Sequence, residues 1–227
     1  MSTGRGNRDC MSKIVNGASR QPLSGKAPRQ IVLLLHGFGS SGSDLIGFVP
    51  HWQHQLPDAL FLAPNAPQRC GFGRGYQWWA LSAFSPQALA SGAASAAGAV
   101  DALVARKLEQ YGLTDSLLAI VGFSQGTMMG LHVGLRRKRA VAGIVGYSGM
   151  LTGGRDLAHQ VASKPPVLLV HGSADRVVPV AALHEAEAAL RRVGIDVMSH
   201  VSPGVGHTVD PVGLRMGADF IVRAFAS

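Results

Sequence analysis

Six short runs of apolar, often branched residues limit what this 227-residue chain can fold into. Most of the runs are apolar at nearly every position and are bounded by Gly, Pro or polar residues, which is typical of strands buried on both faces in a parallel sheet. Longer stretches between the runs carry apolar residues three or four positions apart, which is typical of helices that cover such a sheet. The runs are 31–36, 59–63, 117–122, 141–147, 166–172 and 196–201.

Four amphipathic stretches predict the main helices. The clearest ends at Gly112, where a glycine can take the left-handed conformation that closes a helix. Because strand and helix patterns alternate, we expect an α/β fold with a mostly parallel central sheet and helices on both faces, in one domain over residues 13–227. Residues 1–12 are polar and glycine-rich, and we expect a disordered extension there. The helical stretches are 100–111, 125–136, 179–193 and 211–225.

The net charge of +8 does not indicate a nucleic-acid partner, because most of it lies in one segment. Residues 1–30 hold six Lys or Arg and one Asp, which gives 6 − 1 = +5 and leaves +3 for the rest. The basic cluster at 136–139 follows a predicted helix, where cations favour the negative end of the helix dipole. We interpret it as a solvated helix end, the alternative being a patch for an acidic partner.

Cysteine use and hydropathy predict the compartment. Cys10 and Cys70 are too few for a disulfide framework, so we expect free thiols in a reducing environment. We find neither a signal-peptide core nor an uninterrupted apolar stretch of membrane-spanning length. These features predict a soluble, cytoplasmic protein without stable membrane insertion. They leave open whether it forms a homodimer.

The segment GFSQG at 122–126 is the main candidate for chemistry. It follows the apolar run LLAIV, so Ser124 lies where a buried strand ends and a helix begins. A tight turn of this kind presents a serine hydroxyl without obstruction, and its small residues let the strand and helix approach each other. Gly122 and Gly126 are those small residues. We therefore predict that Ser124 is a nucleophile.

A working serine needs a base and a carboxylate, which follow it along the chain in this topology. Asp175 follows the run PVLLVHG, and His207 lies in a glycine-rich loop after the last run. Both loops leave the same edge of a parallel sheet as Ser124, which is where open α/β sheets bind ligands. Taken singly, Asp175 could cap a helix and His207 could be an ordinary surface histidine. In this order and at these strand ends, we predict that they complete a catalytic triad.

Stabilising an oxyanion requires two backbone donors. One is the amide of Gln125, at the start of the helix after Ser124. The other comes from the loop after the first run, where Gly37 and Gly39 flank Phe38. We interpret His36 as a structural hydrogen-bonding group beneath this loop rather than as a second base.

Several other motifs carry no function in this interpretation. Ser148 also follows an apolar run, but Met150 occupies the place of the second small residue, so we expect Ser148 to be structural. We expect no metal site, because His51 and His54 lack a third ligand nearby. Neither SGKA at 24–27 nor QRCGFGRGY at 68–76 has the spacing of a phosphate-binding loop.

The motifs LLLHGFGSSGSDL, APNAP, GFSQG, HGSADRVVPV and GVGH, together with Trp78-Trp79, resemble the phospholipase/carboxylesterase family of α/β-hydrolases in content and order. The resemblance runs from about residue 15 to residue 224. The family that the chain resembles includes the acyl-protein thioesterases. It implies an α/β-hydrolase fold and hydrolysis of small-molecule carboxylic esters or thioesters without a cofactor. It also implies Ser124, Asp175 and His207 as the triad, with the amides of Phe38 and Gln125 as the oxyanion hole.

Departures from the family pattern bear on the substrate. Ser40-Ser41-Gly42, Ala80 and Thr127 differ from the thioesterase branch and are closer to bacterial carboxylesterases. We therefore expect esters of short to medium acyl chains, with acyl-protein thioesterase or lysophospholipase activity as the alternative. A dienelactone-hydrolase-like enzyme would carry cysteine at 124, and a non-catalytic binding module would be expected to lose a triad member.

The segment Cys70–Phe84 carries three glycines and several large apolar side chains. Trp78 and Trp79 have two interpretations. They are substrate-binding residues that wall an apolar acyl groove, or they are core residues, as most tryptophans are.

Overall fold

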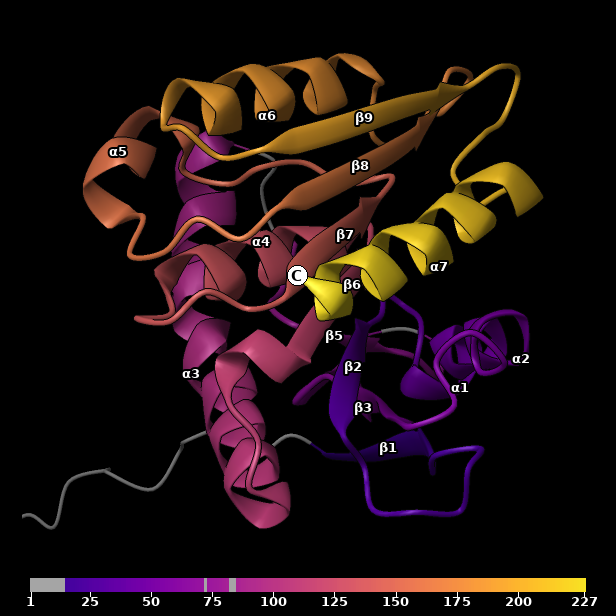
Figure 1. The fold of residues 1–227 in the computed structure, drawn as a ribbon. Coiled ribbons are helices and arrows are strands. Elements are labelled where there is room, and N and C mark those ends of the chain that lie inside the picture. Colours follow the sequence, from indigo (N-terminus) through magenta and orange to yellow (C-terminus); the bar gives the residue numbers. More distant parts are fainter. Residues whose placement is uncertain (1–14, 72, 82–84) are drawn as a thin grey trace, which may run out of the picture.

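The computed structural model describes residues 15–71, 73–81 and 85–227. A seven-stranded mixed sheet runs through the centre in the order β1-β3-β2-β6-β7-β8-β9 (Figure 1). All neighbours pair in parallel except β1, which is antiparallel to β3. The strands are β1 Val15–Arg20, β2 Gln30–Leu35, β3 Ala59–Asn65, β6 Leu118–Phe123, β7 Gly143–Tyr147, β8 Val167–Gly172 and β9 Val197–Ser202.

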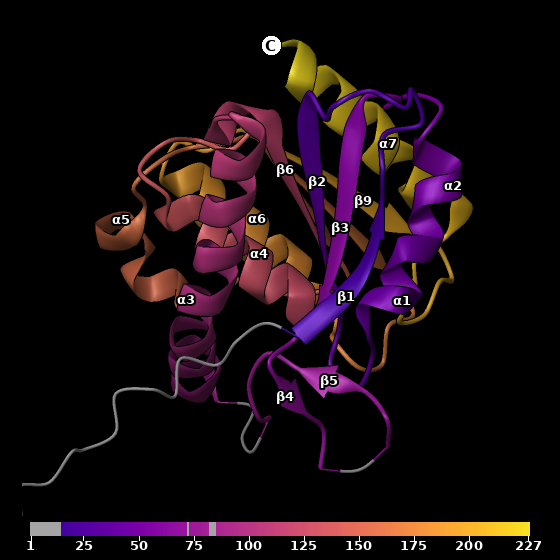
Figure 2. The ribbon, with the colours of Figure 1, turned by 90° about the horizontal axis from the view of Figure 1, so that it is seen from below.

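Helices cover both faces of the sheet, as predicted. Figure 2 shows α3, α4, α5 and α6 on one side and α1, α2 and α7 on the other. Alternate residues of the central strands feed the two resulting cores, so that Leu33 and Leu35 lie in one and Val32 and Leu34 in the other. The helices are α1 Gly42–Leu45, α2 Val49–Trp52, α3 Pro86–Tyr111, α4 Gln125–Arg136, α5 Leu157–Gln160, α6 Ala181–Arg192 and α7 Pro211–Ala226.

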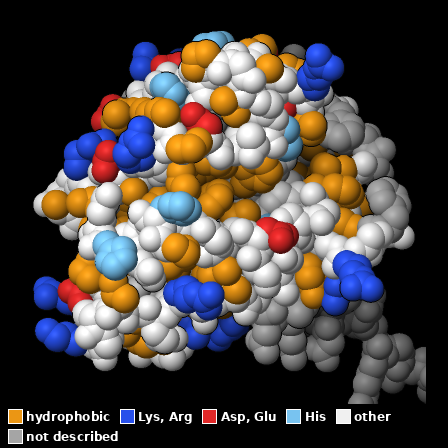
Figure 3. All heavy atoms as spheres, turned by 90° about the vertical axis from the view of Figure 1, so that its right-hand side faces the viewer, with side chains coloured by type: hydrophobic (Ala, Val, Ile, Leu, Met, Phe, Trp, Pro, Cys, Tyr) orange, Lys and Arg blue, Asp and Glu red, His pale blue; other side chains and the backbone are white. Residues whose placement is uncertain are grey.

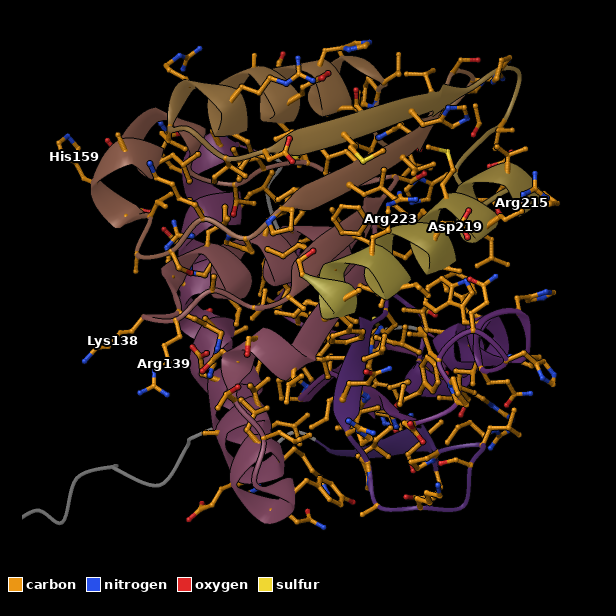
Figure 4. The ribbon with its side chains drawn as sticks, viewed as in Figure 1. Lys138, Arg139, His159, Arg215, Asp219 and Arg223 are labelled. Carbon is orange, nitrogen blue, oxygen red and sulfur yellow. The ribbon has the colours of Figure 1, made fainter. Side chains whose placement is uncertain are left out.

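The six apolar runs correspond to the strands β2, β3, β6, β7, β8 and β9. β8 is buried at all six positions, which explains why its sequence shows no alternation of polar and apolar residues. The predicted helices 125–136 and 211–225 match α4 and α7 closely. On the outer face of α7, Arg215, Asp219 and Arg223 lie at intervals of four residues, opposite the residues that the helix buries (Figure 4).

Helix α3 is longer than predicted and begins at Pro86 rather than near residue 100. Its first half is mostly Ala, Ser and Gly, which gives little amphipathic signal. Ser85 accepts a hydrogen bond from the Ala88 amide, and Gly112 closes the helix at φ 64°, as expected. By length and composition alone α3 could cross a membrane; in this fold one face of it is packed, which buries seven of its residues.

The basic cluster at 136–139 divides into two pairs. Arg137 forms ion pairs with Asp101 and Asp115, and Arg136 donates to the carbonyl of His132. Lys138 and Arg139 are exposed and project away from the protein (Figure 4). Arg137 therefore ties the end of α4 to its neighbours, whereas Lys138 and Arg139 are solvated.

The sequence did not reveal β1 or the hairpin of β4 Gln68–Arg69 and β5 Tyr76–Gln77. β1 is a largely exposed edge strand with a polar sequence, so it lacks the apolar pattern of the other strands. Cys70, beside this hairpin, is a buried free thiol, as expected. Cys10, Phe84 and the expected disordered extension 1–12 lie outside the described residues.

The buried histidine of α4 predicts a stability that depends on pH. His132 is 8% exposed, and its Nδ1 has no partner among the described residues. Burial, with a smaller effect of Arg136, lowers the pKa of His132 to about 4. The unfolded chain therefore takes up this proton first as pH falls below about 6.5, so the contribution of neutral His132 is complete above that pH and is lost toward pH 4.

Between pH 7.5 and 4.5, we expect this group to cost about 2.5 kcal/mol of unfolding free energy. Urea unfolding of wild type and His132→Leu at both pH values measures it as a difference between the two proteins. His184→Leu, which removes an exposed histidine, should leave the pH dependence unchanged. Equal pH dependence of wild type and His132→Leu would contradict the assignment.

Candidate active site

The three predicted polar side chains lie in loops at one edge of the sheet. Ser124 follows β6, Asp175 follows β8 and His207 follows β9, and these strands are parallel. Figure 3 looks onto the edge toward which β8 and β9 point. Hydrophobic side chains gather there along a hollow across the middle of the face, with histidines at its margin.

Ser124 has the strained backbone that its position predicts. Its φ of 54° and ψ of −115° are rare for a residue with a side chain, and it forms the N-cap of α4. The surrounding geometry requires glycines: a Cβ on Gly126 would lie 1.8 Å from the carbonyl oxygen of Leu35, and a Cβ on Gly122 would lie 2.4 Å from the backbone of Gly126. Strand and helix therefore approach too closely for any other residue.

Thr127 fills the space behind this turn. Its Oγ1 lies 2.8 Å from the carbonyl oxygens of Gly122 and Tyr147, so it links the turn to two neighbouring strands. A Cβ on Gly146 would lie 2.6 Å from Thr127 Cγ2, and a Cβ on Gly149 would lie 2.4 Å from Thr127 Cβ. The threonine that departs from the family pattern is thus accommodated by two glycines on the adjacent strand and loop.

Asp175 and His207 are joined by a hydrogen bond of 2.7 Å between Oδ2 and Nδ1. The other carboxylate oxygen, Oδ1, accepts from the amides of Val177 and Val178 at 2.8 and 2.9 Å. Burial by itself raises the pKa of Asp175, but the hydrogen bonds from His207 and the two amides outweigh it and hold the pKa below its usual value. The carboxylate is therefore ionised at neutral pH. It does not cap α6, because the N-cap of that helix is Val180.

The His207 ring lies beside the turn that carries Ser124. Its centroid is 5.0 Å from that of Phe123, the residue before Ser124. The side chain is 18% exposed, so the ring is packed on one side and open to solvent on the other. This position suits a group that exchanges protons with a substrate.

The loop after β2 contacts the same turn. A Cβ on Gly37 would lie 3.2 Å from the Cβ of Ser124, so this loop is packed against the serine. Phe38 is 36% exposed at the surface. Within the described chain, neither the Phe38 amide nor the Gln125 amide donates a hydrogen bond to another protein group. In the described part of the protein both donors are thus unpaired, as a group that binds an oxyanion must be.

His36 holds this loop from beneath. Ala66 donates its amide proton to Nε2 at 3.0 Å, so the ring proton is on Nδ1 and is donated to the Gly37 carbonyl at 2.7 Å. Burial lowers the pKa of His36, which keeps the ring neutral. The structural interpretation of His36 is confirmed.

The β4–β5 hairpin holds the loop from outside. The Gly39 amide donates to the Tyr76 carbonyl at 2.9 Å, and the Tyr76 amide donates to the Ser40 carbonyl at 2.8 Å. The hairpin, which could not be predicted from the sequence, therefore matters for the site. It fixes the backbone of Gly39 and Ser40, directly after Phe38.

The structure corrects the expectation for Trp78 and Trp79. Their side chains are 0% and 4% exposed, so neither walls an open groove. The side chain of Gln125 binds their backbone, accepting from the Trp78 amide at 3.0 Å and donating to the Trp79 carbonyl at 2.9 Å. Trp78 also donates its indole proton to the His36 carbonyl at 2.8 Å. Both tryptophans are core residues that support the loops of the site.

Ser148 shares one feature with Ser124, because its φ is 44°. It differs in access: it is 1% exposed, and its hydroxyl lies 3.5 Å from the Thr208 carbonyl. The expectation that it is structural agrees with this burial. His51 and His54 are exposed, and the described residues include no group of three or more His, Cys, Asp or Glu that could hold a metal.

Comparison with known proteins supports an esterase. The family model described as Phospholipase/Carboxylesterase matches residues 22–224. A solved structure of esterase PE8 is 40% identical, with a TM-score of 0.88 over 93% of this chain and 99% of that one. Esterase YpfH of Escherichia coli is 26% identical over 86% of this chain and 83% of its own. Acyl-protein thioesterase 1 of Neurospora crassa is 28% identical over 85% of each chain.

Proposed function

This chain belongs to the phospholipase/carboxylesterase family and is a carboxylesterase, and from that premise we propose that it cleaves esters of short to medium acyl chains through Ser124, His207 and Asp175. The observation that carries the proposal is the hydrogen bond of 2.7 Å between Asp175 and His207, beside the strained turn of Ser124. The hydrogen bond polarises the His207 imidazole, and this ring packs against Phe123, the residue before Ser124. Such an arrangement is the usual means of activating a hydroxyl.

The proposed reaction has two halves. Ser124 Oγ attacks the ester carbonyl carbon as His207 Nε2 takes its proton, and the Phe38 and Gln125 amides bind the resulting oxyanion. The intermediate collapses, the alcohol leaves with the proton from His207, and an acyl-enzyme remains. Water then attacks the acyl carbon, again losing its proton to His207, and the acid departs as the bond to Ser124 Oγ breaks and Oγ regains the proton from His207. Asp175 stays ionised throughout and holds the His207 proton on Nδ1.

A groove between α3 and α6 is the better candidate for the acyl chain now that the tryptophans are excluded. It has a volume of about 580 Å³, and Met150 and Leu151 form part of it together with Leu89 and Ala90 of α3. Its apolar part begins at Met150, directly after Gly149, which packs against the turn that carries Ser124. We propose that an acyl group bound to Ser124 extends into this groove.

This assignment predicts how the rate depends on acyl length. Each buried CH₂ contributes up to about 0.8 kcal/mol, or about fourfold in kcat/KM, until the groove is filled. We expect kcat/KM to rise from acetate to a medium chain and then level off. The measurement is a series of acyl chains from acetyl to palmitoyl, each offered as an oxygen ester and as a thioester.

The variant Ala90→Phe should fill the groove and reduce the rate on longer acyl esters more than on acetate. Ala94→Phe is the matched control, because Ala94 is exposed one turn along α3 and does not line the groove. Equal losses on all esters would contradict the groove assignment. If palmitoyl thioesters are the best substrates of the wild type, the acyl-protein thioesterase alternative holds instead.

A further inference from the structure

A second buried histidine lies against the carboxylate of Asp175. His171, in β8, is 2% exposed. Its Nε2 lies 2.8 Å from the carbonyl oxygen of Val178 and 3.3 Å from Asp175 Oδ2. A carbonyl oxygen only accepts hydrogen bonds, so Nε2 carries the ring proton. The proton is donated to the Val178 carbonyl, and the same nitrogen lies in contact with the carboxylate at 3.3 Å.

His171 closes a ring of contacts around Asp175. Val178 contacts both side chains. Its amide donates to Asp175 Oδ1 at 2.9 Å, and its carbonyl accepts the proton of His171. Both carboxylate oxygens are therefore surrounded: Oδ1 accepts from two backbone amides, and Oδ2 is hydrogen-bonded to His207 and in contact with His171 at 3.3 Å. Because β8 supplies His171, the loop that carries Asp175 is fixed to the strand from which it emerges.

We propose that His171 is a positioning residue for catalysis, which sets the orientation of the Asp175 carboxylate and limits the negative charge that it presents to His207. This inference rests on the proposed function of Ser124, Asp175 and His207. Nothing in the ordinary three-residue triad requires a second histidine on the carboxylate.

The effect on charge follows from the position of the His171 N–H group. The protonated Nε2 of His171, 3.3 Å from Oδ2, places the positive end of an N–H dipole beside the carboxylate, so the carboxylate stabilises an adjacent imidazolium less. Asp175, and His207 through it, are the titratable groups that face His171. None of the other residues that line a small cavity with His171 is titratable; those from α4 and α6 are Thr127, Leu131, Leu183 and Ala186. Removing His171 should therefore favour protonated His207.

The experiment compares the pH profiles of kcat/KM for three proteins on one acetate ester. We expect His171→Leu to lower kcat about tenfold or more, because the carboxylate loses its fixed orientation. We also expect the midpoint of its acidic limb to move up by about 0.5 pH unit. His171→Gln, whose amide N–H can reach the position of Nε2, should recover most of both changes.

The matched control is His132→Leu, the same substitution at a buried histidine outside the site. It should leave the pH profile at its wild-type position. If His171→Leu does not fold, His171→Asn serves in its place, since its amide is too short to reach both acceptors.

Two outcomes overturn the inference. One is a pH profile of His171→Leu that coincides with that of wild type, with any loss of rate matching the loss of folded protein. The other is a His171→Gln enzyme no better than His171→Leu. Failure of the proposed function is separate, because Ser124→Ala would then remain active whatever His171 does.

Discussion

Replacing Ser124 with alanine should lower kcat on an activated ester by about six orders of magnitude, or about 8 kcal/mol of transition-state stabilisation. The reason is that the residues of a triad act as a unit, so that loss of the nucleophile leaves only the contribution of binding and the oxyanion hole. The backbone at this position is strained by the surrounding strand and helix rather than by the side chain. We therefore expect Ser124→Ala to fold, and circular dichroism checks this.

Reaction with a fluorophosphonate, located by mass spectrometry of peptides, identifies the nucleophile directly. Wild type should be modified at Ser124 alone. Ser148→Ala is the matched control, because Ser148 has a similar φ and lies at the end of the adjacent strand but is buried. Its folded fraction should keep the wild-type modification. Modification of Ser148, or full activity of Ser124→Ala, would overturn the site.

Asp175→Asn should lower kcat by about four orders of magnitude, through a change of tautomer. Because the amides of Val177 and Val178 require an acceptor at Oδ1, the new NH₂ group must take the place of Oδ2, facing His207. There it donates to Nδ1 and moves the ring proton of His207 to Nε2. An Nε2 that already carries a proton cannot accept one from Ser124.

Nitrogen NMR of the His207 ring shows the tautomer independently of the rate. Asp210→Asn, in the loop after β9, is a matched control. Like Asp175, Asp210 accepts from a backbone amide and from a side chain: the Gly213 amide at 3.0 Å and the Ser202 hydroxyl at 2.9 Å. It should change kcat/KM little. An Asp175→Asn enzyme within tenfold of wild type would refute the role of Asp175.

The central strands and the positions of Ser124, Asp175 and His207 could be predicted from the sequence because both follow from burial. Strands covered on two faces must be apolar throughout, and such runs are conspicuous. Once their parallel order is inferred, the residues at their carboxyl ends must meet at one edge. The turn at Ser124 adds its own signal, since glycines are required where β6 and α4 approach.

Features that depend on contacts between distant segments could not be predicted. From the sequence, Trp78 and Trp79 could be taken for residues that line a substrate groove. No neighbouring residue reveals that the side-chain amide of Gln125 binds their backbone. Similarly, β1 and the β4–β5 hairpin have polar sequences, and their structure comes from pairing with β3 and with the Gly39–Ser40 segment. His171 is the histidine of the HGSAD segment and was visible in the sequence, but only its distance from the Asp175 carboxylate suggests a role.

The order of the strands has a consequence for how this enzyme fails under stress. β9 is the last strand of the sheet and is paired on one side only, whereas β6 lies at the centre. Edge elements open at lower free energy than central ones. A fluctuation that frees β9 carries His207 away while Ser124 stays in its turn. On mild heating we therefore expect activity to fall before the circular dichroism signal does. The inactive molecules should recover activity when β9 pairs with β8 again.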